Sequence, residues 1–194
     1  MTRKLLVLPI WTIYLFVIFV FIKMFLADVY FRKSQDLLKK ESTEKALSFA
    51  NKAVSFNPLE PNYFRGRAKI NIVRLGSLGN SKFLKEAVLN DLKIAYSLNP
   101  QNLVTIRNSI PLHYFLTMKF MVLGPVTENL DENYLQPAIN YLERAKKVYW
   151  TDAGVITEVA GYEKKLGLDA DYQESVDRIR QIRPDLLEWH DSFR

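Results

Sequence analysis

An unbroken apolar stretch opens the chain. Residues 5–22 contain no charged side chain, and residues 24–27 continue the stretch beyond Lys23. A helix of about 20 apolar residues is long enough to span a bilayer. Trp11 and Tyr30 lie near the two ends of the stretch, where aromatic side chains concentrate at membrane interfaces. The pattern therefore predicts one transmembrane helix at the N-terminus.

Beyond residue 27 one pattern of positions recurs four times. Each time, two apolar or small residues stand seven positions apart, and proline or tryptophan follows five positions later. The four sets are Ala46, Ala53 and Pro58; Val88, Ala95 and Pro100; Ala138, Ala145 and Trp150; and Tyr172, Ile179 and Pro184. Residues seven apart share a helix face, and proline does not continue a helix, so the pattern predicts stacked helical repeats.

The sequence therefore predicts an all-α chain in two parts. Residues 1–27 form the membrane anchor, and residues 28–194 form an α-solenoid of about four helical hairpins. We expect the units at about 27–60, 61–102, 103–152 and 153–186, and a C-terminal capping helix over 186–194 that covers the last apolar edge.

Helix bounds follow from the same frame. The first unit should hold helices over 28–39 and 43–56, and the second should hold helices over 61–75 and 81–98. We expect Gly76 to end the first of the latter two helices, because a cluster of turn residues begins there. The third unit exceeds a frame of about 34 residues, and we place its excess in a loop around 123–133.

The chain after the anchor resembles the tetratricopeptide repeat (TPR) family. In the first unit the family's small or apolar positions fall on Tyr30, Ser34, Leu37, Ala46, Ala50, Ala53 and Pro58. The aromatic–Leu-Gly–Tyr pattern of the family's first helices is largely absent, and Ile110 followed by Pro111 fits the third unit least. A generic array of helical hairpins is the alternative there. The resemblance implies first helices that line an extended concave binding surface.

A narrower resemblance covers the anchor and the first repeat. The segments Ala27-Asp28-Val29-Tyr30-Phe31 and Ala53-Val54-Ser55-Phe56-Asn57-Pro58 look like the C-terminal part of bacterial O-antigen ligase/polymerase-like membrane proteins, which end in extracytoplasmic TPR units. The multi-span catalytic part of that family is missing from this sequence. The resemblance therefore does not imply glycosyltransfer activity.

The apolar stretch is interpreted as an uncleaved anchor rather than a signal peptide. It exceeds the apolar core of a signal peptide, and Phe25-Leu26-Ala27 has a bulky residue where cleavage needs a small one. Arg3 and Lys4 precede the span, which favours a cytoplasmic N-terminus and an extracytoplasmic repeat domain. Basic residues after the span nearly balance this signal, so the opposite orientation stays open.

Composition adds two restrictions. The chain has no cysteine, which excludes disulfides and thiolate metal sites. Its net charge of +6 is spread along the chain, which fits a membrane surface better than nucleic acid. Two basic clusters would suit anionic lipid or an acidic partner; they are Arg65, Arg67, Lys69 and Arg74, and Arg178, Arg180 and Arg183.

Catalytic chemistry finds little support in the sequence. His113 and His190 are far apart, and we expect each to be a surface or half-buried residue rather than a metal ligand. The sequence has no phosphate-binding glycine loop and no nucleophile elbow. Glu128, Asp131 and Glu132 are interpreted as solvated loop residues. We therefore predict no catalytic residue, no metal, no cofactor and no enzyme activity.

Six side chains are predicted to face the concave groove of the solenoid: Asn62, Arg65, Lys69, Arg107, Asn108 and Tyr114. Arg65 and Lys69 are four positions apart and share a helix face, and Arg107 would lie on the adjacent first helix. This arrangement resembles the basic clamp with which some TPR proteins hold the C-terminal carboxylate of a peptide. A solvated basic face is the alternative.

The leading functional hypothesis is a membrane-anchored scaffold that binds a protein or peptide and assembles a complex at the membrane. The alternative is an accessory, or a detached C-terminal module, of cell-envelope polysaccharide assembly. In that case Tyr63, Tyr114, Tyr134, Tyr141 and Tyr149 would be candidates for stacking on sugars, although aromatic residues in such helices are usually core. A small enzyme with an unrecognised site is a third, weaker hypothesis.

Overall fold

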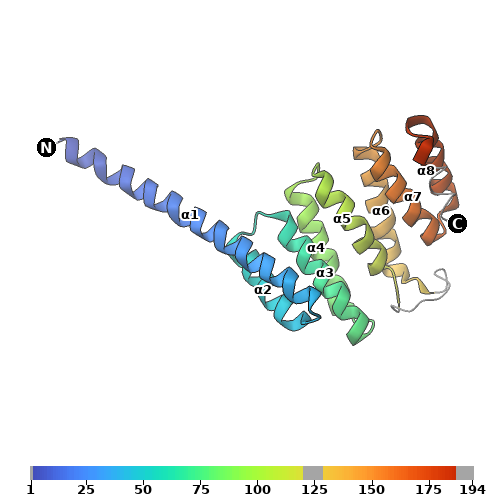
Figure 1. The fold of residues 1–194 in the computed structure, drawn as a ribbon, viewed down its shortest axis with the longest axis horizontal. Helices are drawn as coiled ribbons and strands as arrows, with labels where there is room; N and C mark the ends of the chain where they lie inside the picture. The colour runs from blue at the N-terminus through green and yellow to red at the C-terminus, as the bar shows by residue number, and fades with distance from the viewer. Residues whose placement is uncertain (1, 120–128, 187–194) are drawn as a thin grey trace.

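The computed structural model describes residues 2–119 and 129–186, with side chains described from Trp11 onward. These ranges contain eight α-helices and no strand, apart from an isolated bridge between Met118 and Leu130. The helices stack side by side in one row, and α1 projects from the row at one end while α8 lies at the other (Figure 1). The all-α solenoid predicted from the sequence is confirmed.

The helices form four consecutive hairpins: α1 (Thr2–Lys39) with α2 (Thr43–Phe56), α3 (Pro61–Leu78) with α4 (Lys82–Leu98), α5 (Leu103–Leu116) with α6 (Glu132–Val148), and α7 (Ala153–Leu166) with α8 (Asp169–Ile182). Two predicted bounds were wrong, and the first of them is the start of the first repeat helix. The apolar stretch and the first repeat helix, expected to start at 28, form one continuous helix α1, because no helix-breaking residue separates them.

Small residues allow α2 to lie close to its neighbours. Ala46, Ala50 and Ala53 are fully buried on one face of α2. Ala53 packs with Ala27 of α1 and Tyr63 of α3, whereas Ala46 and Ala50 pack with Ile70 of α3. The first hairpin is thereby joined to the second, as stacking of repeats requires.

The end of α3 differs from the prediction. We expected Gly76 to stop this helix, but α3 continues to Leu78 and Gly79 forms the cap, with a φ of 79°. Glycine adopts such a positive φ without the steric cost that a Cβ atom brings. The Gly79 amide donates to the carbonyl of Leu75, which satisfies one of the free carbonyls at the helix end.

The third hairpin accommodates the residues that fit the repeat frame least. Pro111 lies inside α5, where Ile110 is fully buried in the core. The predicted loop of this unit falls partly on residues 120–128, outside the described residues. Asp131 was expected to be solvated, but it is buried, and its carboxylate lies 2.8 Å from Nζ of the buried Lys85 on α4. The prediction failed because this ion pair joins residues that are distant in the sequence.

The fourth hairpin ends the described part of the solenoid. Gly167, with a φ of 73°, turns the chain between α7 and α8. Lys146 of α6 is buried and lies 2.9 Å from the Glu163 carboxylate of α7 and 2.8 Å from that of Glu174 on α8. Of the predicted cap, only Leu186 is described, and it packs on the cluster formed by Ile156, Ala160 and Ile179. The remainder lies outside the described residues.

The first half of α1 stands away from the solenoid (Figure 1). Every side chain over residues 11–22 is exposed, and the first fully buried residue is Ala27. By length and composition α1 could cross a membrane, a test that signal sequences also pass.

Candidate functional site: a groove along the inner face of α7

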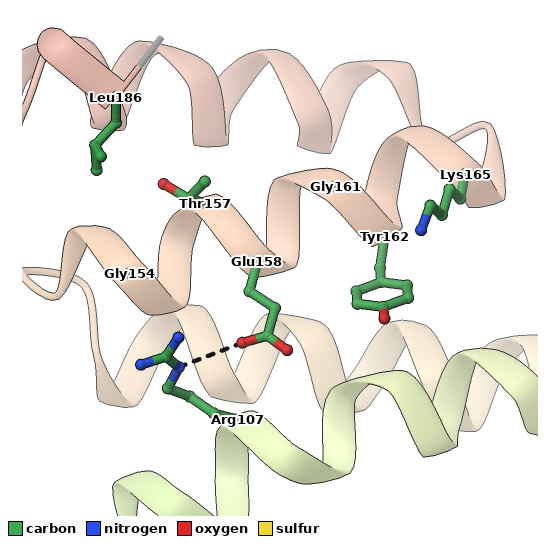
Figure 2. Close-up of a pocket in the computed structure, with 8 residues that line it drawn as sticks. All are labelled: Arg107, Gly154, Thr157, Glu158, Gly161, Tyr162, Lys165 and Leu186. Carbon is green, nitrogen blue, oxygen red and sulfur yellow. Dashed lines mark hydrogen bonds and ion pairs between the residues drawn. The ribbon is translucent and has the colours of Figure 1, made fainter. Parts of the chain in front are cut away.

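The first helices of the hairpins share one face of the solenoid. α3 contacts α5, and α5 contacts α7, while each second helix packs against the first helix of the next hairpin. On this face a groove of about 490 Å³ runs along α7. We call it the α7 groove, and its lining residues are Arg107, Gly154, Thr157, Glu158, Gly161, Tyr162, Lys165 and Leu186 (Figure 2).

The floor of the α7 groove is open at Gly161, which lacks a side chain. Gly154, Thr157, Gly161 and Lys165 follow one another at steps of three or four along α7, so they share one helix face. A Cβ atom added to Gly161 would meet no other atom within 4 Å. Leu186 lies on the opposite side of α7 from Arg107 and bounds the groove there (Figure 2).

An ion pair crosses one side of the groove. Nε of Arg107 on α5 donates to the Glu158 carboxylate on α7 at 3.3 Å (Figure 2). The two side chains are 48% and 26% exposed, so water screens the pair and it contributes little to stability. Thr157 Oγ1 is buried and has no hydrogen-bond partner among the described residues. The groove therefore offers a loosely held guanidinium, a carboxylate and an unsatisfied hydroxyl.

Tyr162 and Lys165 form the other end, and Tyr114 packs against Tyr162. The rings of Tyr114 on α5 and Tyr162 on α7 lie 5.1 Å apart, and Nζ of Lys165 lies 4.7 Å from the centre of the Tyr162 ring. Burial raises the pKa of Tyr114. Burial, together with the charge of Glu158, raises the pKa of Tyr162. Both phenols therefore stay neutral at physiological pH and present flat apolar rings beside a cation.

The six residues predicted for the concave groove are distributed unevenly. Arg107 lines the α7 groove, and Tyr114 packs on its Tyr162 wall. Asn108 and Lys69 are exposed on α5 and α3. Asn62 donates from its amide to Glu60 and accepts from Arg65. The structure thus places Arg107 in the α7 groove and Tyr114 against Tyr162 at its other end, and leaves the other four outside the groove.

Arg65 is much less accessible than a clamp residue would need to be. Its Nε atom is buried without a partner in the described part of the chain, and one of its terminal nitrogens donates to Asn62 at 3.0 Å. Burial lowers the pKa of Arg65 from its ordinary value. The clamp of Arg65, Lys69 and Arg107 stays a prediction.

The basic cluster on α3 is largely used within the fold. Arg67 makes a two-pronged ion pair with Asp91 of α4, at 2.6 and 2.9 Å, and also donates to Asn51 of α2. Arg74 pairs with Glu44 of α2 at 2.9 Å. These two arginines connect neighbouring helices, which leaves Lys69 as the accessible cation of the cluster.

Sequence reasoning missed the residues of α7 that line the groove. Their spacing along one helix face was visible, and Gly161 occupies, counted from the helix start, the position where Lys69 stands in α3. Gly161, a residue type that is expensive inside a helix, was the signal that could have located the groove.

Most of the other histidines and tyrosines that the sequence suggested as candidates are buried in the core. His113, expected at or near the surface, is only 4% exposed, because it is covered by α4 and α6. Tyr63, Tyr134 and Tyr141 are core residues, at 7% exposure or less. His190 lies outside the described residues. Among the described residues, no three His, Cys, Asp or Glu side chains are grouped so as to hold a metal.

Comparison with known proteins identifies the fold of the chain but does not assign it to a sequence family. No protein family model matches the chain, and no curated protein matches it. A TPR protein of Thermus thermophilus is similar in structure, with a TM-score of 0.53 and 17% identity over 81% of this chain and 75% of that one. The MamA protein of Desulfovibrio magneticus has a TM-score of 0.53 and 13% identity over 84% and 79%. The chain therefore has the fold of a TPR solenoid.

Proposed function

We propose that this chain is a membrane-anchored scaffold that binds a protein or peptide partner in the α7 groove and carries no catalytic activity of its own. The observation that supports the proposal most is the open floor at Gly161. Glycine costs a helix interior about 1 kcal/mol relative to alanine, so Gly161 inside α7, with open space beside it, suggests that a partner approaches the backbone there.

The polar groups of the groove suit an extended peptide. The Arg107–Glu158 pair is half-exposed, so a carboxylate of the partner can displace Glu158 from Arg107 at little cost. Lys165 offers a second cation, and Thr157 Oγ1 a hydroxyl without a partner among the described residues. An extended peptide with one carboxylate beside Arg107 and another near Lys165, eleven residues further along α7 from Gly154, would satisfy both cations.

The N-terminal half of α1 supports the anchor. Residues 2–25 precede the first packed positions, and at 1.5 Å per residue they extend about 36 Å, which exceeds a hydrocarbon core of about 30 Å. Their apolar side chains, described from Trp11 onward, are exposed and have no protein to cover them. A cytoplasmic N-terminus with extracytoplasmic repeats is the orientation that we propose.

Comparative purification from membranes tests the scaffold. Tagged full-length wild type, Gly161→Leu and Ser48→Leu would be extracted in mild detergent, and co-purifying proteins would be quantified by mass spectrometry. Gly161→Leu fills the groove, whereas Ser48 is exposed on α2, far along the chain from the groove. The proposal expects a defined set of proteins with wild type and Ser48→Leu that is depleted with Gly161→Leu. An unchanged set with all three variants would contradict it.

The polysaccharide hypothesis keeps one supporting observation. Tyr114 and Tyr162 stand side by side at one end of the groove with parts of their rings accessible. Aromatic faces of this kind can pack against sugar rings. Under this alternative, purified cell-envelope polysaccharide would change the fluorescence of the chain, and Tyr162→Ala would abolish the change. Under the scaffold hypothesis polysaccharide would have no effect.

A further inference from the structure

A second cavity lies between two outer helices, away from the α7 groove. It has a volume of about 420 Å³ and shares no residue with the groove. We call it the His113 cavity. Its lining residues are Leu89, Leu92, Lys93, Tyr96 and Ser97 of α4, His113 of α5, and Pro137, Asn140, Tyr141 and Arg144 of α6. The volume falls in the range of small-molecule sites.

The most deeply buried polar side chain in the wall of the cavity is that of His113. His113 is 4% exposed, and its ring stacks on Tyr141 with 3.9 Å between the ring centres. Neither Nδ1 nor Nε2 has a hydrogen-bond partner within residues 2–119 and 129–186. Buried polar atoms are nearly always paired, so two unpaired nitrogens beside a cavity suggest that an absent molecule completes them.

The imidazole is uncharged. Burial, with a smaller effect from the charge of Lys93, lowers the pKa of His113 to about 3. A neutral imidazole has one N–H that donates and one nitrogen that accepts. A hydroxyl group can both accept and donate a hydrogen bond. It therefore suits the neutral imidazole at the bottom of this cavity better than a charged group does.

The rim of the cavity carries positive charge. Lys93 and Arg144 are exposed, and neither makes an ion pair in the part of the chain that the structure describes. The Arg144 guanidinium lies 5.8 Å from the centre of the Tyr96 ring. No aspartate or glutamate occurs among the described lining residues. Two unopposed cations above apolar walls attract an anion to the entrance.

We propose that the His113 cavity binds a small amphipathic carboxylate that has an apolar, preferably aromatic, body and a hydroxyl at its far end. The carboxylate pairs with Lys93 and Arg144, the apolar body lies against Leu89, Leu92 and Pro137, and the hydroxyl meets His113. The same chemistry is offered by a free hydroxyaryl acid and by the C-terminal tyrosine of a peptide.

Histidine resonances provide a direct test, because His113 and His190 are the only histidines. The full-length chain in detergent micelles would be labelled with ¹³C and ¹⁵N at histidine, and His190→Gln would assign the two sets of signals. The probes are 4-hydroxyphenylacetate, its amide, phenylacetate and the free-acid peptide Ala-Ala-Ala-Tyr. The two acids that carry a hydroxyl distinguish the two sources of the chemistry.

We expect 4-hydroxyphenylacetate or Ala-Ala-Ala-Tyr to shift the His113 signals saturably while His190 stays unchanged. The amide should bind about tenfold more weakly, because it loses the ion pairs at the rim. Phenylacetate should also bind more weakly, because it leaves His113 unpaired. His113 signals that do not move with either acid, or that move equally with the amide, would overturn the proposal, and the cavity would then hold only water.

Variants locate the binding. Lys93→Gln with Arg144→Gln should weaken the two hydroxylated acids about tenfold and leave the amide unchanged. Arg32→Gln with Lys45→Gln is the matched control, since both residues are exposed on the first hairpin. His113→Phe keeps a ring against Tyr141, and saturation-transfer signals of the probes should then no longer favour 4-hydroxyphenylacetate over phenylacetate. If the control double variant weakened binding of the acids as much as the rim double variant does, the proposed position of the binding site would be wrong.

Discussion

At the residue scale, long basic side chains join neighbouring helices through ion pairs in which at least one partner is buried. Arg67 reaches Asp91, Lys85 reaches Asp131, and Lys146 reaches Glu163. Each pair also makes further hydrogen bonds; Lys85, for example, donates to the carbonyl of Met118 at 2.7 Å. Breaking one partner of such a pair leaves an uncompensated buried group, which costs far more than losing a surface pair.

Lys85→Met should destabilise the chain by about 3–5 kcal/mol, because Asp131 would lose its buried partner. Lys82→Met is the control on the same helix. Lys82 pairs with Glu86 at 3.8 Å while 85% exposed, so its loss should cost less than about 1 kcal/mol. Chemical unfolding of the full chain in micelles measures both. Similar losses for the two variants would show that the Lys85 pair is not buried.

Asp131 makes part of this stability depend on pH. Desolvation alone would raise the pKa of this carboxyl, but hydrogen bonds from Lys85 and Asn133 and the charge of Lys85 lower it below its ordinary 3.8. The folded state therefore holds the proton less tightly than the unfolded state. The gain in stability is present above about pH 4 and is lost as the pH falls further. In Asp131→Asn this part of the acid dependence should vanish.

His113 gives a second pH dependence, in a different range. Its pKa falls from about 6.5 in the unfolded chain to about 3 in the fold. Between these values the unfolded state binds the proton, so the free energy of unfolding decreases as the pH falls, by up to about 1.4 kcal/mol per pH unit. Unfolding of His190→Gln at pH 7.5, 6 and 5 should reveal this slope, and adding His113→Phe should flatten it. An unchanged slope would mean that a group other than His113 causes this pH dependence.

Close contacts between helices determine the fold at the element scale. A Cβ atom on Gly66 of α3 would lie 2.9 Å from Cζ of Phe31 on α1, and closer still to another atom of that ring. Gly66 therefore sets the distance between α1 and α3. Gly161 on α7, in contrast, faces the open groove.

Gly66→Ala and Gly161→Ala should have opposite effects on the melting temperature. Overpacking against Phe31 should cost about 1–3 kcal/mol in the first variant. The second should gain up to about 1 kcal/mol, because alanine favours a helix over glycine and no atom obstructs it. Circular dichroism at 222 nm on heating measures the difference. Equal shifts would mean that one of the two helix faces is assigned wrongly.

The sequence predicts second helices better than it predicts sites. The helix expected over 43–56 coincides with α2, because Ala46, Ala50 and Ala53 must share a buried face. The helix expected over 28–39 instead starts far upstream as part of α1, because the end of a membrane span carries no local helix-stopping signal. The α7 groove and the His113 cavity each combine residues from three separate segments, and periodicity within one segment does not reveal such combinations.

At the scale of the whole molecule, the solenoid should be separable from its anchor. The chain lacking residues 1–26 keeps Ala27 and every other buried residue that the structure describes. We expect this shortened chain to leave the membrane fraction, to be helical by circular dichroism and to melt cooperatively, although the domain boundary itself stays a prediction. A shortened chain that remains with membranes, or that has substantial strand content, would contradict this expectation.

The central claim is that the face of α7 meets a protein partner at the membrane. Photo-crosslinking in intact cells tests it most directly, with p-benzoylphenylalanine replacing Tyr162, an aromatic residue that already lines the groove, and, as the control, placed at position 48 on α2. The account predicts a discrete protein adduct from position 162 in the membrane fraction and none from position 48. Equal, diffuse labelling from the two positions, or no adduct at 162 in membranes that retain the chain, would contradict it.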